Sequence, residues 1–481
     1  MVFPVVGGNE SKVYEISNSL RFNDDDSASL SFTPSGNPTD ADKFTISCWI
    51  KLGNIGVNNA KIYDTGGSDD NNRFALQFQG TNSTLMTSNN SGVSIITSQV
   101  LRDPSAWYHV VAAIDSQNST TNNKHIIYVN GVQADIGTNN LGSTSQVGAM
   151  TNGVAQYIGR NGGADNSHFD GYMTEFHFVD GQQLAPTSFG EFDDNGVWIP
   201  KKYTGTYGNN GFFLQFKQTG TSQNSSGIGA DTSGEDNHFA VTNLAATDIT
   251  EDTCTNNFAT LNPLFRSNFD NDGTFLEGNC QRDFTDNANR GYGMSTIGVT
   301  SGKWYWEIKV IGSDVSRIGI GVGYDGLSAF TSPFYDNNPS LGMHFYSSAS
   351  VSANGSTQSY GSAASANDIF MYALDMDNHL IWLGVNGSWF NSATVTEIQN
   401  STATNDITTK LSSQTFLNSG EPVFPMVNDL STTGASQFQI NFGNPPFSIS
   451  SGNNDGKYGN FEYAPPSGYY ALCTKRLAEF G

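Results

Sequence analysis

Hydrophobic and polar residues alternate over many short segments of this chain. Residues 44–50 (FTISCWI) and 303–310 (KWYWEIKV) show the clearest alternation, with the period of two that predicts a half-buried β-strand. In the second segment Trp304 and Trp306 share one face, while Glu307 lies on the other. Residues 107–114 (WYHVVAAI) are apolar on both faces, which is typical of a central strand.

These strand patterns form two dense blocks, at residues 20–218 and 263–472. The segment 219–262 between them is rich in Ser, Thr, Asn and Asp, and we expect it to be an extended connection that packs along a neighbour. An arm (1–19) and a tail (473–481) complete the chain. The pattern therefore predicts an all-β protein with two antiparallel β-sandwich domains of jelly-roll type in series, joined by a long irregular connection.

Composition supports strands and turns over helices. Of 481 residues, 52 are Gly and 12% are aromatic, while only 14% are charged. Small turn-forming residues combined with aromatics are typical of short strands joined by many turns. Only the last ten residues have a helix-forming composition.

The charge balance narrows the possible partners. The chain has 22 Lys+Arg against 45 Asp+Glu, a net charge of −23. Binding to phosphate backbones or anionic lipids needs clustered cations, so we expect no nucleic-acid partner and no membrane insertion. The N-terminal residues lack the basic and apolar regions of a signal peptide, which predicts a protein made in the cytoplasm without Sec export. The four cysteines match no zinc motif, and a disulfide between Cys254 and Cys280 is one alternative.

The first block (20–218) resembles a laminin G-like domain of the concanavalin A-like lectin superfamily. The residues that carry the resemblance are LRF at 20–22, FTISCWIK at 44–51, WYHV at 107–110, YVNG at 128–131 and FDGY at 169–172. The resemblance implies a sandwich of two antiparallel sheets.

The second block (263–472) resembles a SPRY domain. The matching residues are GKWYWE at 302–307, IGIGV at 318–322, LDMD at 374–377, GVNG at 384–387 and VFPMV at 423–427. It departs from that pattern in Ser/Asn-rich inserts around 346–366 and 391–420. These inserts put an inherited ligand loop in doubt.

The combination of the two modules is similar to virion proteins of marine tailed bacteriophages. The segments 189–200, 255–263 and 468–474 suit that group. The resemblance implies a virion surface location, contacts to other virion proteins through the N-terminal arm, and a homo-oligomer, which would be a trimer in a fibre.

Catalytic patterns are weak in this sequence. It contains no GxSxG, HExxH or P-loop motif. Retaining glycosidases need two carboxylates about 5 Å apart, but Glu175 has no acidic neighbour two residues away on its strand, and Asp375 with Asp377 fits a turn. We therefore expect a protein that is not an enzyme.

Calcium is the metal that the resemblance implies, because laminin G-like modules often hold Ca²⁺ at the sandwich rim. Ca²⁺ prefers carboxylate, amide and carbonyl oxygens. We predict Asp69, Asp70, Asn72 and Asp165 as ligands, and the run at 24–26 (DDD) is a further candidate cluster.

Aromatic residues near loops are candidates for sugar binding, because a pyranose ring packs on an aromatic face while polar groups fix its orientation. We predict Trp389 and Phe390, after the turn Asn386-Gly387, together with Tyr346 and the loop residue His168. The other strand histidines are expected in the core.

The leading hypothesis is a bacteriophage virion surface protein, a tail fibre or decoration, that binds carbohydrate or another envelope component of a bacterial host. One alternative is a purely structural virion decoration or adaptor without a glycan ligand. The other is a polysaccharide depolymerase.

Overall fold

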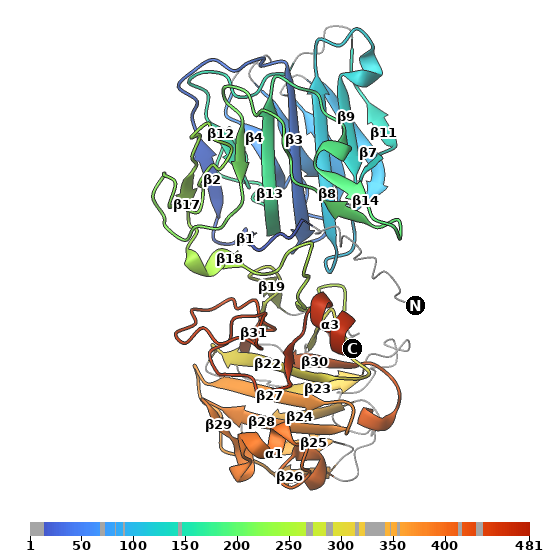
Figure 1. The fold of residues 1–481 in the computed structure, drawn as a ribbon, viewed down its shortest axis with the longest axis vertical. Helices are drawn as coiled ribbons and strands as arrows, with labels where there is room; N and C mark the ends of the chain where they lie inside the picture. Colours follow the sequence, from blue (N-terminus) through green and yellow to red (C-terminus); the bar gives the residue numbers. More distant parts are fainter. Residues whose placement is uncertain are drawn as a thin grey trace, which may run out of the picture.

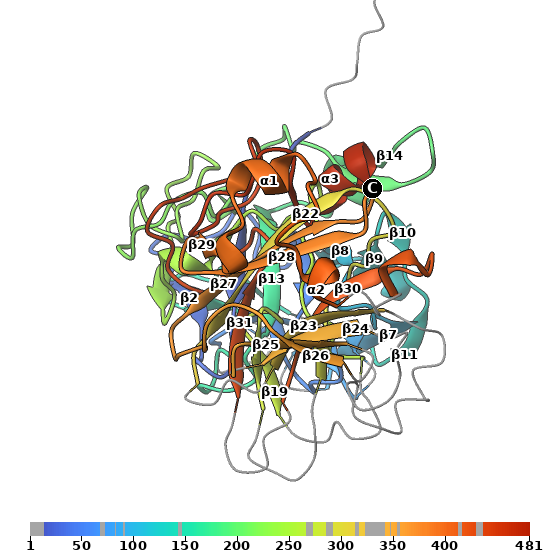
Figure 2. The same cartoon turned by 90° about the horizontal axis from the view of Figure 1, so that it is seen from below.

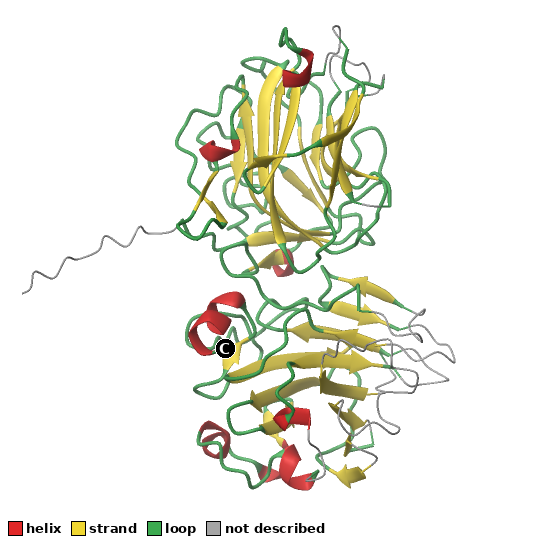
Figure 3. Cartoon of the chain, turned by 90° about the vertical axis from the view of Figure 1, so that its right-hand side faces the viewer, coloured by secondary structure: helices red, strands yellow, loops and turns green. Residues whose placement is uncertain are grey.

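The chain folds into two β-sandwiches that are stacked along the long axis of the molecule (Figure 1). The computed structural model describes residues 14–67, 73–81, 83–89, 92–142, 147–265, 273–284, 292–312, 317–322, 342–346, 348–353, 356–411, 416–429 and 436–481. Strands of the first sandwich run along the long axis, and strands of the second run across it (Figures 1 and 3). The predicted all-β class with antiparallel sheets is confirmed.

The first sandwich contains two sheets of eight strands each. In spatial order, one sheet consists of β10 (Val132–Gln133), β9 (His125–Val129), β8 (Trp107–Asp115), β3 (Lys43–Leu52), β13 (Gly171–Asp180), β1 (Ser19–Phe22) and β18 (Ile249–Thr250), with β16 (Phe212–Leu214) paired to β13. The other consists of β11 (Ile136–Asn139), β7 (Ser94–Val100), β6 (Thr84–Ser88), β5 (Ala75–Gln79), β4 (Lys61–Thr65), β12 (Gln156–Ile158), β2 (Ser29–Phe32) and β17 (Ala240–Thr242).

Alternation along β3 explains the core of this sandwich. Phe44, Ile46, Cys48 and Ile50 are buried between the two sheets, as the period of two predicts. The opposite face of β3 carries Trp49, which is covered by other segments of the chain. Both faces of this strand are therefore buried, although its pattern is that of a half-buried strand.

The second sandwich is built from an eight-stranded and a six-stranded sheet. The first of these contains, in order, β19 (Thr274–Leu276), β20 (Gln281–Asp283), β31 (Gln437–Asn441), β22 (Lys303–Val310), β27 (Ile369–Asp375), β28 (Leu380–Val385) and β29 (Ser388–Trp389), with β32 (Tyr470–Ala471) parallel to β22. The other contains β21 (Tyr292–Met294), β30 (Val423–Asn428), β23 (Arg317–Val322), β24 (Gly342–Tyr346), β25 (Ser350–Ala353) and β26 (Ser356–Ser359).

Helical segments among the described residues are short. They are η2 (Thr121–Asn123), η3 (Pro186–Ser188), η4 (Ala246–Asp248), η6 (Phe390–Ser392), η7 (Phe416–Asn418), α1 (Val395–Gln399), α2 (Ile407–Lys410) and α3 (Thr474–Phe480). Seen from below, α2 lies beside β28, which it contacts (Figure 2). The tail forms α3, within the last ten residues, whose composition is helix-forming. None of the described helices is long and apolar enough to cross a membrane.

The segment 219–262 adds edge strands to the first sandwich. Its strand β17 pairs with β2, and β18 pairs with β1. Phe239 and Leu244 are buried in the core of the first sandwich. From Asp252 onward the chain crosses to the second sandwich, where Phe258 is fully buried.

Candidate functional site

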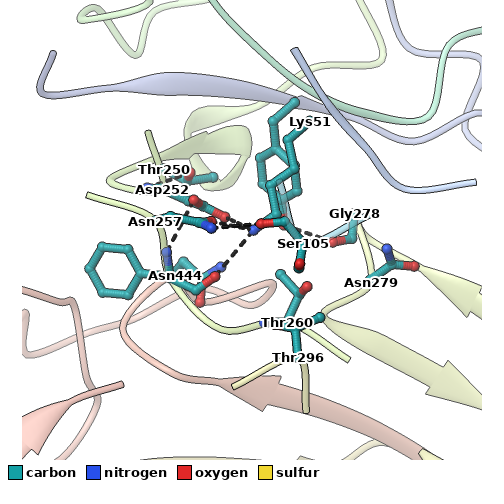
Figure 4. A network of polar contacts seen from close by, with 12 residues as sticks. Lys51, Ser105, Thr250, Asp252, Asn257, Thr260, Gly278, Asn279, Thr296 and Asn444 are labelled. Carbon is teal, nitrogen blue, oxygen red and sulfur yellow. Dashed lines mark hydrogen bonds and ion pairs between the residues drawn. The ribbon is translucent and has the colours of Figure 1, made fainter. Parts of the chain in front are cut away.

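A buried polar network fixes the junction between the two sandwiches (Figure 4). Lys51 of β3 projects into it, and its Nζ lies 2.8 Å from Asp252 Oδ2. The same Nζ donates to Asn257 Oδ1 (2.8 Å) and to the carbonyl oxygen of Phe258 (3.1 Å). Trp107 Nε1 donates to the other carboxylate oxygen of Asp252 at 3.2 Å. The Lys51 ammonium group and both carboxylate oxygens of Asp252 are paired, so this pair has the character of a structural clamp.

A second cation, Arg21 of β1, reaches from the first sandwich toward the second. Its Nε lies 3.1 Å from Glu277 Oε2, and its guanidinium donates to the carbonyl oxygens of Thr247 and Pro445. The side chain is 1% exposed. Asp248 lies 3.5 Å away, so Arg21 is already neutralised by two carboxylates.

An acidic cleft of about 370 Å³ opens at this junction. Asp24, Asp25 and Asn54 line it from the first sandwich. Apolar residues line the opposite wall from the second, including Leu264, which is 58% exposed, and Phe275. We call this space the interdomain cleft; it combines acceptors for hydroxyl groups with apolar surface.

Asp170 lies next to the interdomain cleft and is 5% exposed. Neither oxygen of its carboxylate hydrogen-bonds to any residue that the structure describes. It lines a space of about 10 Å³ together with Asn54, which also lines the interdomain cleft. Burial, followed by the negative charges of Asp24 and Glu277, raises the pKa of Asp170 well above its ordinary value.

Glycine backbone brings the two sandwiches close together here. Tyr172 donates from its hydroxyl group to the carbonyl oxygen of Gly278 at 2.9 Å. Gly278 has a φ of +57°, and a Cβ atom there would lie 2.5 Å from the Tyr172 ring, so only glycine fits. The next residue, Asn279, donates from its amide to the carbonyl oxygen of Gly53 at 3.0 Å, while its Oδ1 atom makes no hydrogen bond to the described residues.

Of the four predicted metal ligands, the structure describes Asp165. Asp69, Asp70 and Asn72 lie outside the described residues. Asp165 is 64% exposed and pairs with Arg160 at 2.8 Å. Among the residues that the structure describes, no three His, Cys, Asp or Glu side chains are grouped so that they could hold a metal ion.

The prediction that Phe390 is exposed as a sugar-binding residue is wrong. This side chain is 6% exposed and packs against Tyr360 and Phe370 in the core of the second sandwich. The chain reverses at Asn391, whose φ is +54°, and this reversal keeps Phe390 inside. Trp389 is half-buried and packs against the neighbouring apolar cluster.

The other two predicted ligand residues have different settings. His168 is buried, and its Nε2 lies 3.3 Å from Asp165 Oδ1. Tyr346 ends β24, and its side chain is not among the described ones. The four predicted sugar ligands therefore do not form one site in the described part of the chain. Cys254 and Cys280 are both free, so the alternative of a disulfide between them is wrong.

A second polar cluster on the first sandwich is closed. His109 accepts a hydrogen bond from Trp198 Nε1 at 2.9 Å, and its other ring nitrogen lies 2.8 Å from Ser47 Oγ. Burial lowers the pKa of His109 to about 3, so the ring is neutral and fully paired. Glu175 nearby is 5% exposed and accepts from the Tyr14 hydroxyl at 2.8 Å. The strand histidines are core residues as predicted, and this cluster offers no space for a substrate.

Comparisons with solved structures give distant matches. The SPRY domain of human HERC1 is 17% identical and covers 37% of this chain and 96% of its own, with a TM-score of 0.28. A putative carbohydrate binding protein from Bacteroides ovatus is 16% identical, with coverages of 47% and 58% and a TM-score of 0.30. A heptameric SAP-like pentraxin from Limulus polyphemus is 16% identical, with coverages of 36% and 80% and a TM-score of 0.27.

A search of curated proteins finds no match. Residues 24–185 match the model of the concanavalin A-like lectin/glucanases superfamily. This segment supplies Asp24, Asp25, Asn54 and Asp170 to the junction. The chain therefore carries a concanavalin A-like lectin fold in its first sandwich.

Proposed function

We propose that this protein binds carbohydrate in the interdomain cleft and serves as a surface protein of a bacteriophage particle, a tail fibre or decoration that attaches to host polysaccharide. The observation that carries the proposal is the position of the cleft, at the edge of a lectin-type sandwich. Its virion setting rests on the sequence resemblance alone.

The chemistry of the cleft suits a sugar ring. Carboxylate oxygens of Asp24 and Asp25 accept hydrogen bonds from hydroxyl groups, and the amide of Asn54 can both donate and accept. Leu264 and Ile55 supply apolar surface for the C–H face of the ring. Single sites of this kind are weak, so several copies on one particle would act together, with avidity gains of roughly 10² to 10⁴.

The test measures binding and hydrolysis together. Labelled protein is incubated with host cells and with purified surface polysaccharide, and bound protein and released reducing ends are both quantified. We expect binding without release. Release of reducing ends would instead establish the depolymerase alternative.

Two matched variants localise the site. Leu264→Ser removes exposed apolar surface in the cleft, and Val395→Ser removes a similar aliphatic side chain that is 48% exposed on α1. We expect Leu264→Ser to weaken polysaccharide binding at least several-fold and Val395→Ser to leave it unchanged. Equal binding by both variants and the parent protein would refute the cleft as the site.

The structural alternative is favoured by one observation, the fully paired clamp around Lys51 and Asp252. Such a clamp holds two modules at a fixed angle, which a spacer between virion parts requires. Absence of binding to cells and polysaccharide, with intact binding to purified particles that lack the protein, would support this role.

A further inference from the structure

We propose that Lys51 and Asn257 join through an intramolecular isopeptide bond, with Asp252 as the group that transfers the protons. The bond links β3 of the first sandwich to the connection that enters the second sandwich. It is a covalent modification of the chain itself, so the proposal goes beyond carbohydrate binding and does not depend on it.

The nucleophile and its target are in contact. Lys51 Nζ lies 2.8 Å from Asn257 Oδ1 (Figure 4). Because Oδ1 is bonded to Cγ, the atom that an amine attacks, a small shift of Nζ converts this hydrogen bond into a reactive approach. Asn257 Nδ2 donates to the carbonyl oxygen of Ser105 at 2.6 Å, which fixes the amide from its other side. Groups held in such an orientation react far faster than the same groups free in solution.

A third group stands ready to move protons. Asp252 Oδ2 lies 2.8 Å from the same Lys51 Nζ. The other oxygen, Oδ1, accepts from Trp107 Nε1 and from the backbone N–H of Phe258, each at 3.2 Å, so the carboxylate is held in place. An ammonium group becomes a nucleophile only after it loses a proton to a neighbouring base. Asp252 is that base, and in its protonated form it is the acid that the departing Asn257 Nδ2 requires.

The surroundings keep water away from the reacting groups. The side chain of Lys51 is 1% exposed and that of Asp252 is 0% exposed. Trp107 and Tyr172 are buried beside them, with Lys51 Nζ 5.6 Å from the centre of the Tyr172 ring. Exclusion of water suppresses competing hydrolysis. Burial of two opposite charges also carries a desolvation cost that their attraction offsets only in part, so their replacement by neutral groups is favourable.

The reaction balances without any other reactant. Asp252 takes a proton from Lys51 Nζ, the freed electron pair attacks Asn257 Cγ, and the Nζ–Cγ bond forms. One proton from Nζ passes through Asp252 to Nδ2, the Cγ–Nδ2 bond breaks, and ammonia leaves. The second proton lost by Nζ stays on Asp252, so the ion pair becomes a neutral amide beside a neutral carboxyl group. The clamp is an ion pair until this reaction takes place, and its contribution to stability is measured on unreacted chains.

Mass spectrometry of the denatured full chain tests the proposal directly. We expect a mass lower than that of the sequence by one ammonia, and a tryptic digest in which the peptide with Lys51 is joined to the peptide with Asn257. An unshifted mass would overturn the proposal. Loss of one water instead would place the bond at Asp252 and would overturn the assignment to Asn257, as would loss of ammonia without the joined peptides.

Matched substitutions identify the reacting residues. Lys51→Arg retains a cation for Asp252 but has no amine, and Asn257→Ala removes the target, so neither variant should lose ammonia. Lys43→Arg is the control on the same strand, because Lys43 is 37% exposed and pairs with Asp115; it should lose ammonia as the parent protein does. Circular dichroism of each variant shows that it is folded. Loss of ammonia in either folded Lys51→Arg or folded Asn257→Ala would refute the assignment.

Discussion

The clamp between the sandwiches allows a quantitative test. Lys51→Met keeps most of the length of the side chain but removes the ammonium group, whose exposure is 1%. Asp252, whose side chain is 0% exposed, then remains as a buried carboxylate without its cation. Asn257 and the carbonyl oxygen of Phe258 lose a donor at the same time.

The expected loss of stability follows from the burial of the Lys51–Asp252 ion pair. Removing one partner of a buried ion pair costs about 3–5 kcal/mol, because the remaining charge is uncompensated, whereas an exposed pair contributes about 0–1 kcal/mol. We therefore expect Lys51→Met to lower the free energy of unfolding by about 3–5 kcal/mol. Adding Asp252→Asn removes that stranded charge, and the amide oxygen can still accept from Trp107 and from the backbone of Phe258. The double variant should be more stable than the single one by roughly 1–3 kcal/mol.

Urea denaturation measures these effects through tryptophan fluorescence and far-ultraviolet circular dichroism. Trp107 donates to Asp252 directly, so its fluorescence reports on the clamp, and dichroism reports on both sandwiches. Transitions at different urea concentrations would show that the sandwiches unfold separately, and each would then be fitted on its own. A cost below about 1 kcal/mol for Lys51→Met, the range of exposed pairs, would refute the reasoning. A double variant less stable than Lys51→Met would refute it as well.

Three further predictions concern single residues. Phe390→Ala should lower the free energy of unfolding by about 3–5 kcal/mol in urea denaturation, because a buried ring is lost from the core. A loss as small as that caused by truncating an exposed side chain would contradict the burial of Phe390. Gly131→Ala should destabilise by more than about 1 kcal/mol, because φ is +80° and a Cβ atom would collide with the Trp198 ring; an unchanged melting temperature would argue against this contact. Burial raises the pKa of Glu307 from 4.5 to about 7, so the folded state holds this proton more tightly than the unfolded state. The contribution of Glu307 to stability is therefore greatest below about pH 4.5 and is lost as the pH rises to about 7, and urea midpoints of Glu307→Gln should lack this part of the pH dependence.

Much of the fold could be predicted from the sequence, because strand patterns are local. The alternation in residues 44–50 and 303–310 lies in β3 and β22. Asn130-Gly131 forms the predicted turn, with φ of +47° and +80°, the backbone signature of a tight hairpin. These features depend on neighbouring residues in the chain, so pattern and structure agree.

The candidate site could not be predicted in the same way. Asp170 belongs to the segment FDGY, whose pattern marks it only as a residue just before a strand. Its carboxylate lies against Gly53, more than 100 positions earlier in the chain, and only the tertiary fold brings these two residues together. For Phe390 the sequence predicts exposure, because the residue lies in an Asn/Ser-rich loop, but the side chain is buried. The next two residues, Asn391 and Ser392, have positive φ and turn the chain back over the core.

The interdomain cleft exists only while the two sandwiches keep their relative orientation. Lys51 and Arg21 set that orientation from one side, through contacts to Asp252 and Glu277. Asp170 and Asn279 come from different sandwiches and meet at Gly53. A sugar held in the cleft by both sandwiches would favour the same orientation as the clamp, and two interactions that favour one state must strengthen each other by equal factors. Loss of the clamp should therefore weaken polysaccharide binding, and bound polysaccharide should in turn protect the connection after Asp252 from proteolysis.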